Sequence, residues 1–375
     1  MANNNENKIL NVPHLRFPEF SGEWKKCIIQ DYGEVVTGNT PPTNNAEYYN
    51  NGSYLWASPA DLGINKNVTD TKTKLSLSGF KKTRNVPKGS VLVTCIGSTI
   101  GKMGMATETM SSNQQINSVV VNDKNNSDFV YYAICRAFPR YLSEVGVQAV
   151  PILSKSNFEK LPNYTTSRDE QNKIGYFLSL LDERIATQNK IIDKLQSLIK
   201  GLAVALTTKG KPNIAISQCL ECHSSTLQES EVLPNGLYKV FGANGLVGYT
   251  DVPQMSSDAI LVIKDGSGVG TVSYAQGKFS VIGTLNYLTA IGNIDLRYLY
   301  FALSVFNFQP YKTGMAIPHI YFKDYGKAKI YCPPLAEQKH VANVLGKLES
   351  KLFVEQGLLA LFNQQKQYLL GQMFI

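Results

Sequence analysis

Two stretches of the chain carry an apolar residue at every third or fourth position. The first begins after Ser167 and the second after Pro334. This spacing places the apolar side chains on one face of a helix and is typical of a coiled coil. A single amphipathic helix is only marginally stable in water, so each helix predicts a partner. We expect the two to pair antiparallel through Ile174, Leu178, Leu181, Ile185, Gln188, Ile192 and Leu195 of the first and Leu345, Leu348, Leu352, Glu355 and Leu359 of the second.

Both helices carry polar residues inside the apolar pattern. Gln188 occupies an apolar position of the first helix, and Glu355 occupies the equivalent position of the second. In an antiparallel pair these residues would meet at the centre, where a buried polar contact fixes the register of a coiled coil. Lys366 is a second interruption, and Ser167 with Glu170 predicts a capping box where the first helix begins. The alternative is two unrelated helices that pack on separate cores.

The duplication extends into the segments before the helices. Val91-Leu92-Val93 matches Ile260-Leu261-Val262, at nearly the same offset that relates the two helices. A chain built as globule, long helix, globule, long helix predicts two similar halves related by a pseudo-twofold axis. We place the first globule at residues 1–165, the first helix at 166–206, the second globule at 207–333 and the second helix at 334–375.

Inside each globule the pattern changes to short apolar runs separated by Gly, Pro and Asn. These runs predict strands at residues 34–36, 53–57, 90–95 and 118–121, and at 237–241, 259–264 and 269–274. Periodic stretches predict helices at 128–144 and 296–306. This mixture places each globule in the α+β class. The second globule is visibly shorter, and its residues 217–233 match the first poorly.

The composition limits the partners and the compartment. The chain has 375 residues, 37 basic against 29 acidic side chains and a net charge of +8, which favours a polyanionic partner. The polar N-terminal segment does not resemble a signal peptide, and no apolar run approaches the length of a membrane span. Six cysteines without regular spacing suit a reducing compartment. We therefore expect a cytoplasmic protein that does not bind a membrane.

Two short motifs look like cofactor sites but lack essential parts. Cys219 and Cys222 precede His223 with the spacing of a covalent haem site, yet no export signal, distal ligand or second Cys/His pair accompanies them. Residues 97–102 resemble a phosphate-binding loop, but three residues separate its glycines where that loop needs four. We interpret the first motif as chance and the second as a tight turn whose amide groups could face a DNA phosphate.

The usual signatures of catalysis are missing from the sequence as well. The two Pro-Pro segments, at residues 40–43 and 332–335, lack the aromatic residue of a methyltransferase catalytic loop and follow no cofactor-binding glycine motif. Acidic residues are scattered rather than clustered for metal, and the four histidines are far apart. We therefore predict no catalytic residue, no metal site and no cofactor in this chain.

Basic side chains gather in the first globule and, more thinly, in the second. Residues 66–102 contain eight lysines and arginines, Lys66 among them, and one acid. Such a surface positions DNA by its phosphates, while amides and hydroxyls on loops read bases; an ordinary solvated surface is the alternative. Asn117 and Asn286 match between the copies, which favours structural roles. The DNA-binding candidates are Asn39, Thr40, Lys72, Lys74, Lys81, Lys82, Arg84, Lys102, Asn113, Gln114 and Gln115, then Lys312, His319 and Lys323, with Thr284 and Asn286 as further candidates.

Taken together, these features resemble the specificity subunit of a type I restriction-modification enzyme over nearly the whole chain. No one motif is decisive. The resemblance is carried by Val12-Pro13-His14-Leu15-Arg16-Phe17-Pro18 before Trp24, by Gly38-Asn39-Thr40-Pro41, by residues 96–102 and 240–245, by the helix openings Asp169-Glu170-Gln171 and Ala336-Glu337-Gln338, and by Leu181-Asp182-Glu183-Arg184-Ile185.

The resemblance implies a non-catalytic subunit with two target recognition domains, each reading one half of a split DNA sequence across a helical spacer. It implies two modification subunits that methylate adenine with S-adenosylmethionine, and restriction subunits that use ATP and Mg²⁺. Exposed polar residues of the first helix are docking candidates, with solvated surface as the alternative: Glu183, Arg184, Lys190 and Lys194. Two other hypotheses are a stand-alone DNA-binding adaptor without a methyltransferase partner and an enzyme whose site is not recognised.

Overall fold

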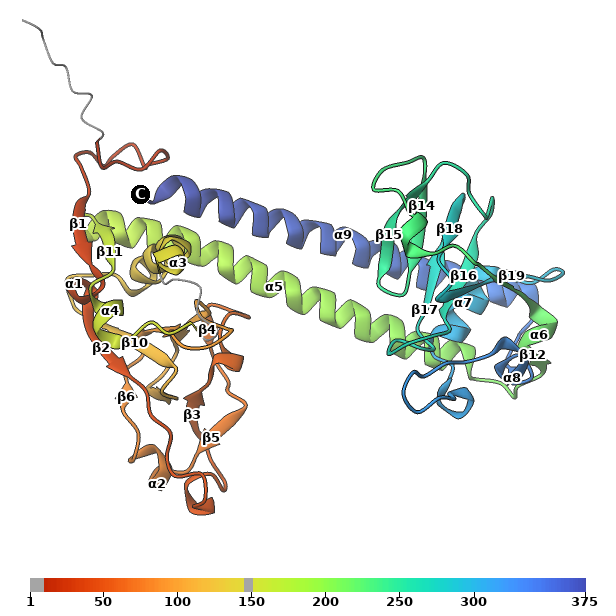
Figure 1. The fold of residues 1–375 in the computed structure, drawn as a ribbon, viewed down its shortest axis with the longest axis horizontal. Coiled ribbons are helices and arrows are strands. Elements are labelled where there is room, and N and C mark those ends of the chain that lie inside the picture. The colour runs from red at the N-terminus through yellow and green to blue at the C-terminus, as the bar shows by residue number, and fades with distance from the viewer. Residues whose placement is uncertain (1–9, 145–150) are drawn as a thin grey trace, which may run out of the picture. The chain divides into compact units, whose positions relative to one another are not determined.

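The computed structural model describes residues 10–144 and 151–375. The chain divides into two compact units, Met1–Asn189 with Leu358–Ile375, and Lys190–Gly357. We call them unit 1 and unit 2 and describe each by itself. The long helices α5 (Arg168–Thr207) and α9 (Leu335–Met373) contribute residues to both units (Figure 1). No helix among the described residues is both long enough and apolar enough to cross a membrane.

The strands of unit 1 are β1 (Lys25–Ile28), β2 (Gly33–Thr37), β3 (Tyr54–Ala57), β4 (Asn67–Val68), β5 (Thr73–Leu75), β6 (Asn85–Val86), β7 (Val91–Thr94), β8 (Met103–Ala106), β9 (Met110–Ser112), β10 (Ile116–Val121) and β11 (Pro162–Thr165). The central sheet has the order β2-β10-β7-β8-β4, a second sheet has the order β5-β3-β9-β6, and β1 pairs with β11. The shorter helices are α1 (Ile29–Tyr32), α2 (Leu77–Phe80), α3 (Ser127–Glu144) and α4 (Lys155–Glu159).

Strand β7 is buried on both faces, which explains its continuous apolar sequence. Val91 and Val93 face α3 and share one core with Phe129. Leu92 points to the other face, where it packs with Leu55 of the second sheet. The successive layers of unit 1 are therefore long helices, α3, central sheet and second sheet.

The strands of unit 2 are β12 (Ile214–Ala215), β13 (Leu220–Ser224), β14 (Tyr238–Gly242), β15 (Gly245–Thr250), β16 (Ala259–Ile263), β17 (Val272–Ala275), β18 (Phe279–Val281), β19 (Leu285–Ala290) and β20 (Lys329–Ile330). They form sheets of order β13-β19-β16-β17 and β15-β14-β18, and β12 pairs with β20. The shorter helices are α6 (Ile216–Cys219), α7 (Leu296–Ser304) and α8 (Phe322–Tyr325).

The two units repeat one topology. The order β2-β10-β7-β8 corresponds to β13-β19-β16-β17, and the pair β1–β11 corresponds to β12–β20. The offset in sequence is larger between β2 and β13 than between β10 and β19, so unit 2 has a shorter chain between these strands. Strand β13 keeps its place in the sheet without keeping the sequence, which is why residues 217–233 match poorly. The prediction of two similar α+β domains is confirmed.

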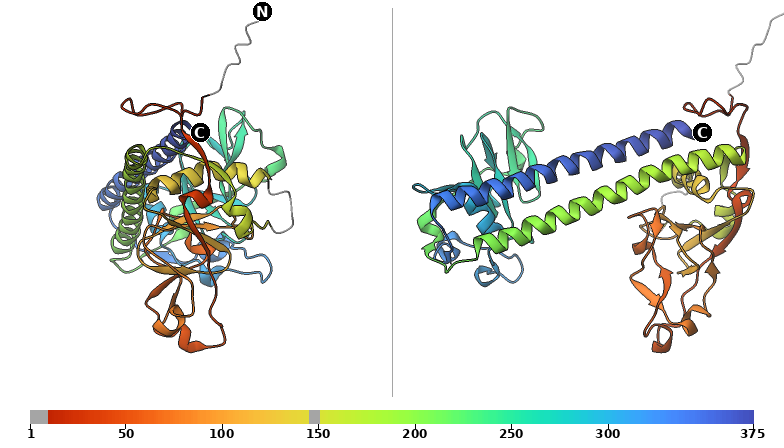
Figure 2. Two further views of the ribbon diagram at one scale, coloured as in Figure 1. Left: turned by 90° about the vertical axis from the view of Figure 1, so that its left-hand side faces the viewer. Right: turned by 180° about the vertical axis from the view of Figure 1, so that it is seen from behind.

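In each unit the two long helices lie side by side and run in opposite directions (Figures 1 and 2). In unit 1, Ile174 of α5 shares a core with Leu369 of α9. In unit 2, Ala203 of α5 shares a core with Val341 and Leu345 of α9. The predicted antiparallel pairing is confirmed. Among the residues expected to pair, Ile174, Leu178, Gln188, Ile192, Leu345 and Glu355 are buried, and Leu181, Ile185, Leu195, Leu348, Leu352 and Leu359 are half-buried.

The start of α5 is held by Arg16 rather than by a complete capping box. The Glu170 amide donates a long 3.4 Å hydrogen bond to Ser167 Oγ. The Glu170 carboxylate, 1% exposed, accepts from Arg16 Nε at 2.7 Å and Nη2 at 2.8 Å. A two-pronged guanidinium contact is charge-assisted and outcompetes the neutral backbone donor that a capping box would use. The reciprocal half of the predicted capping box is therefore wrong.

Candidate nucleic-acid interface

Asn39 follows β2 at the end of the central sheet, and its side chain is used inside the protein. The amide nitrogen Nδ2 donates to Lys82 O at 2.9 Å, and Oδ1 accepts from the Arg84 amide at 2.7 Å. The Asn39 amide donates to Ser112 O at 2.9 Å. Asn39 therefore joins three segments of the candidate surface, and both ends of its side chain are occupied.

Asn113 and Gln115, in the turn between β9 and β10, also bond within the protein. Asn113 is 8% exposed, and its Nδ2 donates to Gln115 Oε1 at 3.1 Å. Gln115 Nε2 donates to Ile96 O at 3.3 Å, which ties this turn to the glycine-containing turn after β7. These two predicted base-reading side chains shape the surface rather than present a free edge.

Gln114, between them, is exposed and differently placed. Thr40 Oγ1 donates to Gln114 Oε1 at 2.6 Å. Among the described residues, none accepts a hydrogen bond from the Gln114 amide nitrogen. The structure thus brings Asn39, Thr40, Asn113, Gln114 and Gln115 together, and among them Gln114 is the fully exposed side chain.

An aromatic cluster that the sequence analysis did not single out supports this surface. Trp56 Nε1 donates to Asn39 O at 3.1 Å, and Tyr49 OH donates to Pro41 O at 2.7 Å. Tyr54 stacks on Phe80, with ring centroids 4.6 Å apart. The aromatic residues concentrated in the sequence near residues 40–56 could have indicated this cluster, because aromatic rings next to a Pro-rich loop commonly hold that loop in place.

The basic candidates fall into separate places. Lys81, Lys82 and Arg84 follow α2, are exposed and adjoin Asn39, and Arg84 Nη1 donates to Thr37 O at 2.9 Å. Lys74 lies on β5 and pairs with Asp70 at 2.8 Å. The remaining two candidates, Lys72 and Lys102, are exposed, Lys72 beside Asp61 and Lys102 beside Gly63.

Lys66 does not belong to the basic surface, although it lies in the basic stretch of the sequence. Its side chain is 5% exposed, and Nζ lies 2.5 Å from Asp128 Oδ1 and 2.6 Å from Ser179 Oγ. A buried ammonium needs an opposite charge and hydrogen-bond acceptors, and α3 and α5 provide them here. The interpretation of Lys66 as part of a phosphate-binding surface is wrong.

In unit 2 the candidates surround the loop before α8. His319 packs edge-on against Tyr321, with centroids 5.0 Å apart, and Lys323 Nζ lies 5.1 Å from the centre of the same ring. His319 and Thr313 exchange backbone hydrogen bonds of 2.8 and 2.9 Å. These bonds bring Lys312, the neighbour of Thr313, near His319 in space. His319 and Lys323 therefore both contact the Tyr321 ring where the loop enters α8, and Lys312 lies in the same loop.

The matched asparagines have matched partners. Asn117 Oδ1 accepts from Thr37 Oγ1 at 2.7 Å, and Asn286 Oδ1 accepts from Ser224 Oγ at 2.9 Å. Each bond joins equivalent neighbouring strands, and both asparagines are buried. Their structural interpretation agrees with these contacts, and Thr284, whose buried Oγ1 finds no partner among the described residues, offers no exposed reading group.

The motifs set aside in the sequence have ordinary structural roles. Cys219 is buried in α6, and its Sγ donates to Ala215 O at 3.5 Å, whereas Cys222 lies on β13, where burial raises its pKa to about 11. No three His, Cys, Asp or Glu side chains among the described residues are grouped to hold a metal ion. Gly97 and Gly101 have φ of 95° and 90°, as a tight turn requires, and the Gly97 and Gly101 amides donate to Pro151 O and Thr94 O within the protein.

Comparison with known proteins agrees with the duplicated architecture. The family model described as the type I restriction modification DNA specificity domain matches residues 21–197 and 220–362. The chain belongs to this family. Its two matches fall on the two repeated topologies, so the specificity domain occurs twice in one chain.

Individual relatives in the family are distant. The HindI specificity subunit of Haemophilus influenzae is 26% identical over 186 residues, and the MjaIX specificity subunit of Methanocaldococcus jannaschii is 30% identical over 188 residues. These alignments cover 47% and 46% of this chain, and the chain spans only 40% and 42% of the two relatives. The S subunit of a type I system from M. genitalium has the same fold, with a TM-score of 0.70 at 19% identity over 97% of this chain and 99% of that one.

Proposed function

We propose that this chain is a specificity subunit of a type I restriction-modification enzyme, in which each unit carries a domain that reads one half of a split DNA target. The observation that carries the proposal is the match of a DNA specificity domain to both repeats of the topology. Two reading domains in one chain fit a target in two parts, because each domain can contact its own half of the sequence.

The contacts in unit 1 support a division of labour on its reading surface. Exposed Lys81, Lys82 and Arg84 would neutralise phosphates, while Gln114, steadied by Thr40, would bond a base edge. A glutamine amide pairs bidentately with adenine in the major groove. The other proposed phosphate contacts are Lys72, Lys74 and Lys102 of unit 1 and Lys312, His319 and Lys323 of unit 2.

The long helices are the proposed docking surface for two modification subunits. Large apolar side chains are exposed along them, among them Tyr176 at 67% on α5 and Phe353 at 77%, Leu361 at 60% and Tyr368 at 63% on α9. Large apolar side chains that remain exposed along α5 and α9 favour a protein partner. Four charged residues of α5 are also exposed and would form polar contacts with the same partner: Glu183, Arg184, Lys190 and Lys194.

The chain itself would be non-catalytic and cytoplasmic. S-adenosylmethionine would bind to the modification subunits, and ATP and Mg²⁺ to restriction subunits, since the candidate residues here are shaped for hydrogen bonding and phosphate contact. We also propose that the first recognition domain ends at residue 165, the first spacer helix at residue 206 and the second recognition domain at residue 333.

Mapping of methylated adenines in cells that express the modification subunit, with and without this chain, tests the proposal. We expect one bipartite motif to be methylated only when the chain is present, and the chain to co-purify with the modification subunit. A motif that persists without the chain would overturn the proposal. DNA binding without co-purification would indicate a stand-alone adaptor instead.

A further inference from the structure

Each unit attaches its domain to the long helices through a helix of the domain, α3 in unit 1 and α7 in unit 2. We call the contacts between that helix and the long helices the junction. One contact is the same in both. The amide of Asn126 donates to Gln171 Oε1 at 2.8 Å, and the amide of Asp295 donates to Gln338 Oε1 at 2.9 Å. The two junctions are therefore equivalent in position, and their differences can be compared residue by residue.

Each junction also centres on one acidic side chain of a long helix. Asp182 of α5 and Glu349 of α9 occupy equivalent positions of the helix repeat. Tyr132 OH donates to Asp182 Oδ2 at 2.5 Å, and Tyr300 OH donates to Glu349 Oε1 at 2.8 Å. Both carboxylates are less than a quarter exposed, so each requires a cation nearby.

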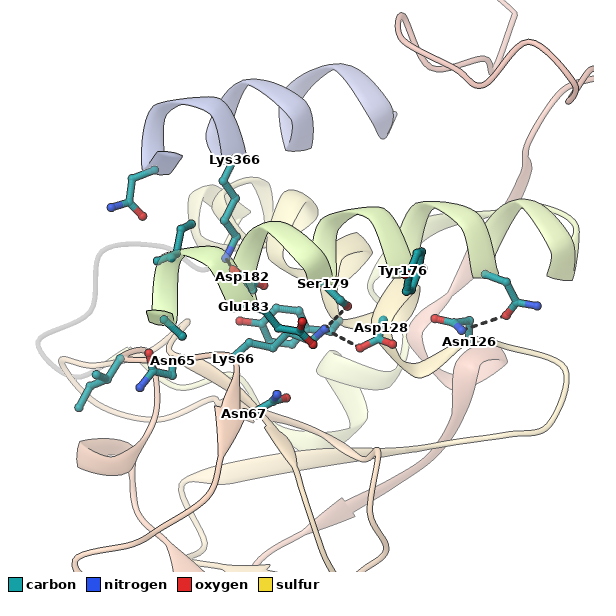
Figure 3. Close-up of a pocket in the computed structure, with 17 residues that line it drawn as sticks. Asn65, Lys66, Asn67, Asn126, Asp128, Tyr176, Ser179, Asp182, Glu183 and Lys366 are labelled. Carbon is teal, nitrogen blue, oxygen red and sulfur yellow. Dashed lines mark hydrogen bonds and ion pairs between the residues drawn. The ribbon is translucent and has the colours of Figure 1, made fainter. Parts of the chain in front are cut away.

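The cation comes from opposite sides of the two junctions. In unit 1 it belongs to a long helix, because Lys366 Nζ of α9 lies 2.6 Å from Asp182 Oδ1 (Figure 3). In unit 2 it belongs to the domain, because Arg297 of α7 pairs with Glu349. The residue of unit 2 that is equivalent to Lys366 is Ile199, which carries no charge.

The domain helices differ by a full reversal of charge at one position. Asp128 of α3 and Arg297 of α7 are equivalent, at the same offset in sequence that relates β10 to β19. Asp128 pairs with the buried Lys66 of its own domain (Figure 3). The Arg297 guanidinium instead lies 4.3 Å from the centre of the Tyr274 ring and reaches the long helix.

We propose that these residues form a charge pattern that lets each domain seat on its own segments of the long helices and not on those of the other. Arg297 placed against the unit 1 segments would meet Lys366, giving two cations for the one carboxylate of Asp182. The unit 1 domain would carry Asp128 already paired with Lys66, so its exchange onto the unit 2 segments would leave Glu349 beside uncharged Ile199 without a cation. One exchange therefore brings two cations together and the other leaves a carboxylate unpaired, and both are costly at a partly buried site.

This inference extends the proposed function and rests on it for its biological meaning. Two similar domains in one chain could seat on either pair of helix segments, within one chain or between two copies. If each domain reads a different half-target, the charge pattern preserves which half is read at which end of the helices.

The structure also shows that the pattern of unit 1 could be built in unit 2. A cavity of about 220 Å³ lies beside Glu349, and Ile199, Tyr300 and Leu352 are among the residues that line it. A lysine at position 199 could therefore extend toward Glu349 as Lys366 extends toward Asp182. The domain's own cation could then be removed without leaving Glu349 unpaired.

Thermal unfolding of full-length variants tests the inference. Arg297→Asp should lower Tm by about 5 °C, because Glu349 loses its cation and meets an acid. Ile199→Lys added to Arg297→Asp should recover at least half of that loss, and the recovery should shrink at high salt. The matched control is Ile199→Met with Arg297→Asp, which adds a similar chain length without charge.

A recovery by methionine equal to that by lysine, or a recovery insensitive to salt, would overturn the inference, because packing alone would then explain it. If Arg297→Asp does not fold, the neutral Arg297→Gln background permits the same lysine-against-methionine comparison. These measurements need no DNA, so they can fail while the proposed function holds. Absence of sequence-specific DNA binding by the unsubstituted chain would contradict the proposed function. It would leave the unfolding result unchanged.

Discussion

The hydroxyl of Thr40 donates a 2.6 Å hydrogen bond to the side-chain carbonyl of Gln114. This bond orients an exposed amide that follows the buried Asn113 and lies close to the basic segment after α2. A side chain that is exposed but already oriented loses little conformational freedom when it binds a base.

Gln114→Ala should therefore change DNA recognition without changing stability. We expect a loss of about 1–3 kcal/mol in specific binding, concentrated at one base pair, because a bidentate base contact is removed. Asn113→Ala should instead lower the stability by about 1–3 kcal/mol, since it leaves buried partners unsatisfied. Binding to a set of single-base variants of the target, together with urea unfolding, separates the two effects. Uniform weakening of all targets by Gln114→Ala would contradict a reading role.

Removal of Lys81 and Lys82 should weaken binding to all sequences and reduce its dependence on salt. The slope of log Kobs against log salt should fall by about 0.9 for each phosphate that is no longer neutralised. The control is Lys124→Ala, an exposed lysine before α3 that follows β10, whereas the reading turn with Gln114 precedes that strand. An unchanged slope in the Lys81→Ala, Lys82→Ala variant would place the phosphate contacts elsewhere.

Arg16 should be essential to the stability of unit 1, because it pairs with a Glu170 carboxylate that is 1% exposed. Arg16→Ala strands that charge, and we expect a loss of about 3 kcal/mol in the free energy of unfolding. Arg168→Ala, at the exposed first residue of α5, should change it by less than about 0.5 kcal/mol. Equal effects in urea denaturation would show that Glu170 does not depend on Arg16.

Alkaline pH should destabilise the protein through its buried tyrosines. Burial, with the neighbouring Asp182 carboxylate, raises the pKa of Tyr132 well above its ordinary value. The folded state therefore keeps this proton while the unfolded state loses it above pH ~10, and the stability falls by about 1.4 kcal/mol per pH unit for one such tyrosine. The contribution is fully present below that pH.

Tyr132→Phe should make this alkaline decline less steep, and Tyr176→Phe, at a tyrosine that is 67% exposed, should leave it unchanged. The measurement is the free energy of unfolding across the alkaline range for both variants and the parent chain. Identical slopes in all three would contradict the assignment of Tyr132 as a buried, neutral hydrogen-bond donor.

Much of the architecture was predictable from local patterns. The long helices follow from apolar residues at helical spacing. Strands β7 and β16 follow from continuous apolar runs, which are typical of a strand buried on both faces. The β1–β11 and β12–β20 pairs were not predicted, because they join distant segments whose side chains do not alternate. Strand β13 was hidden because its place is set by pairing with β19, not by its own sequence.

The candidate site was predictable in location and not in detail. Residue type made Asn39 and Gln114 equal candidates, yet the bonds to Lys82 and Arg84 occupy the amide of Asn39. Likewise Lys66 counted as a surface charge until its contact with Asp128 placed it in the interior. Such roles depend on which distant segments meet, and a single sequence carries no record of that.

Removal of one heptad from each long helix, followed by mapping of methylated adenines, tests most directly whether the paired helices set the distance between two reading domains. Seven residues shorten a helix by about 10 Å, which corresponds to about three base pairs of DNA. If two reading domains are held apart by the paired helices, both half-sites should persist while the gap between them shortens. A methylated motif with an unaltered gap, or with altered half-sites, would contradict the account.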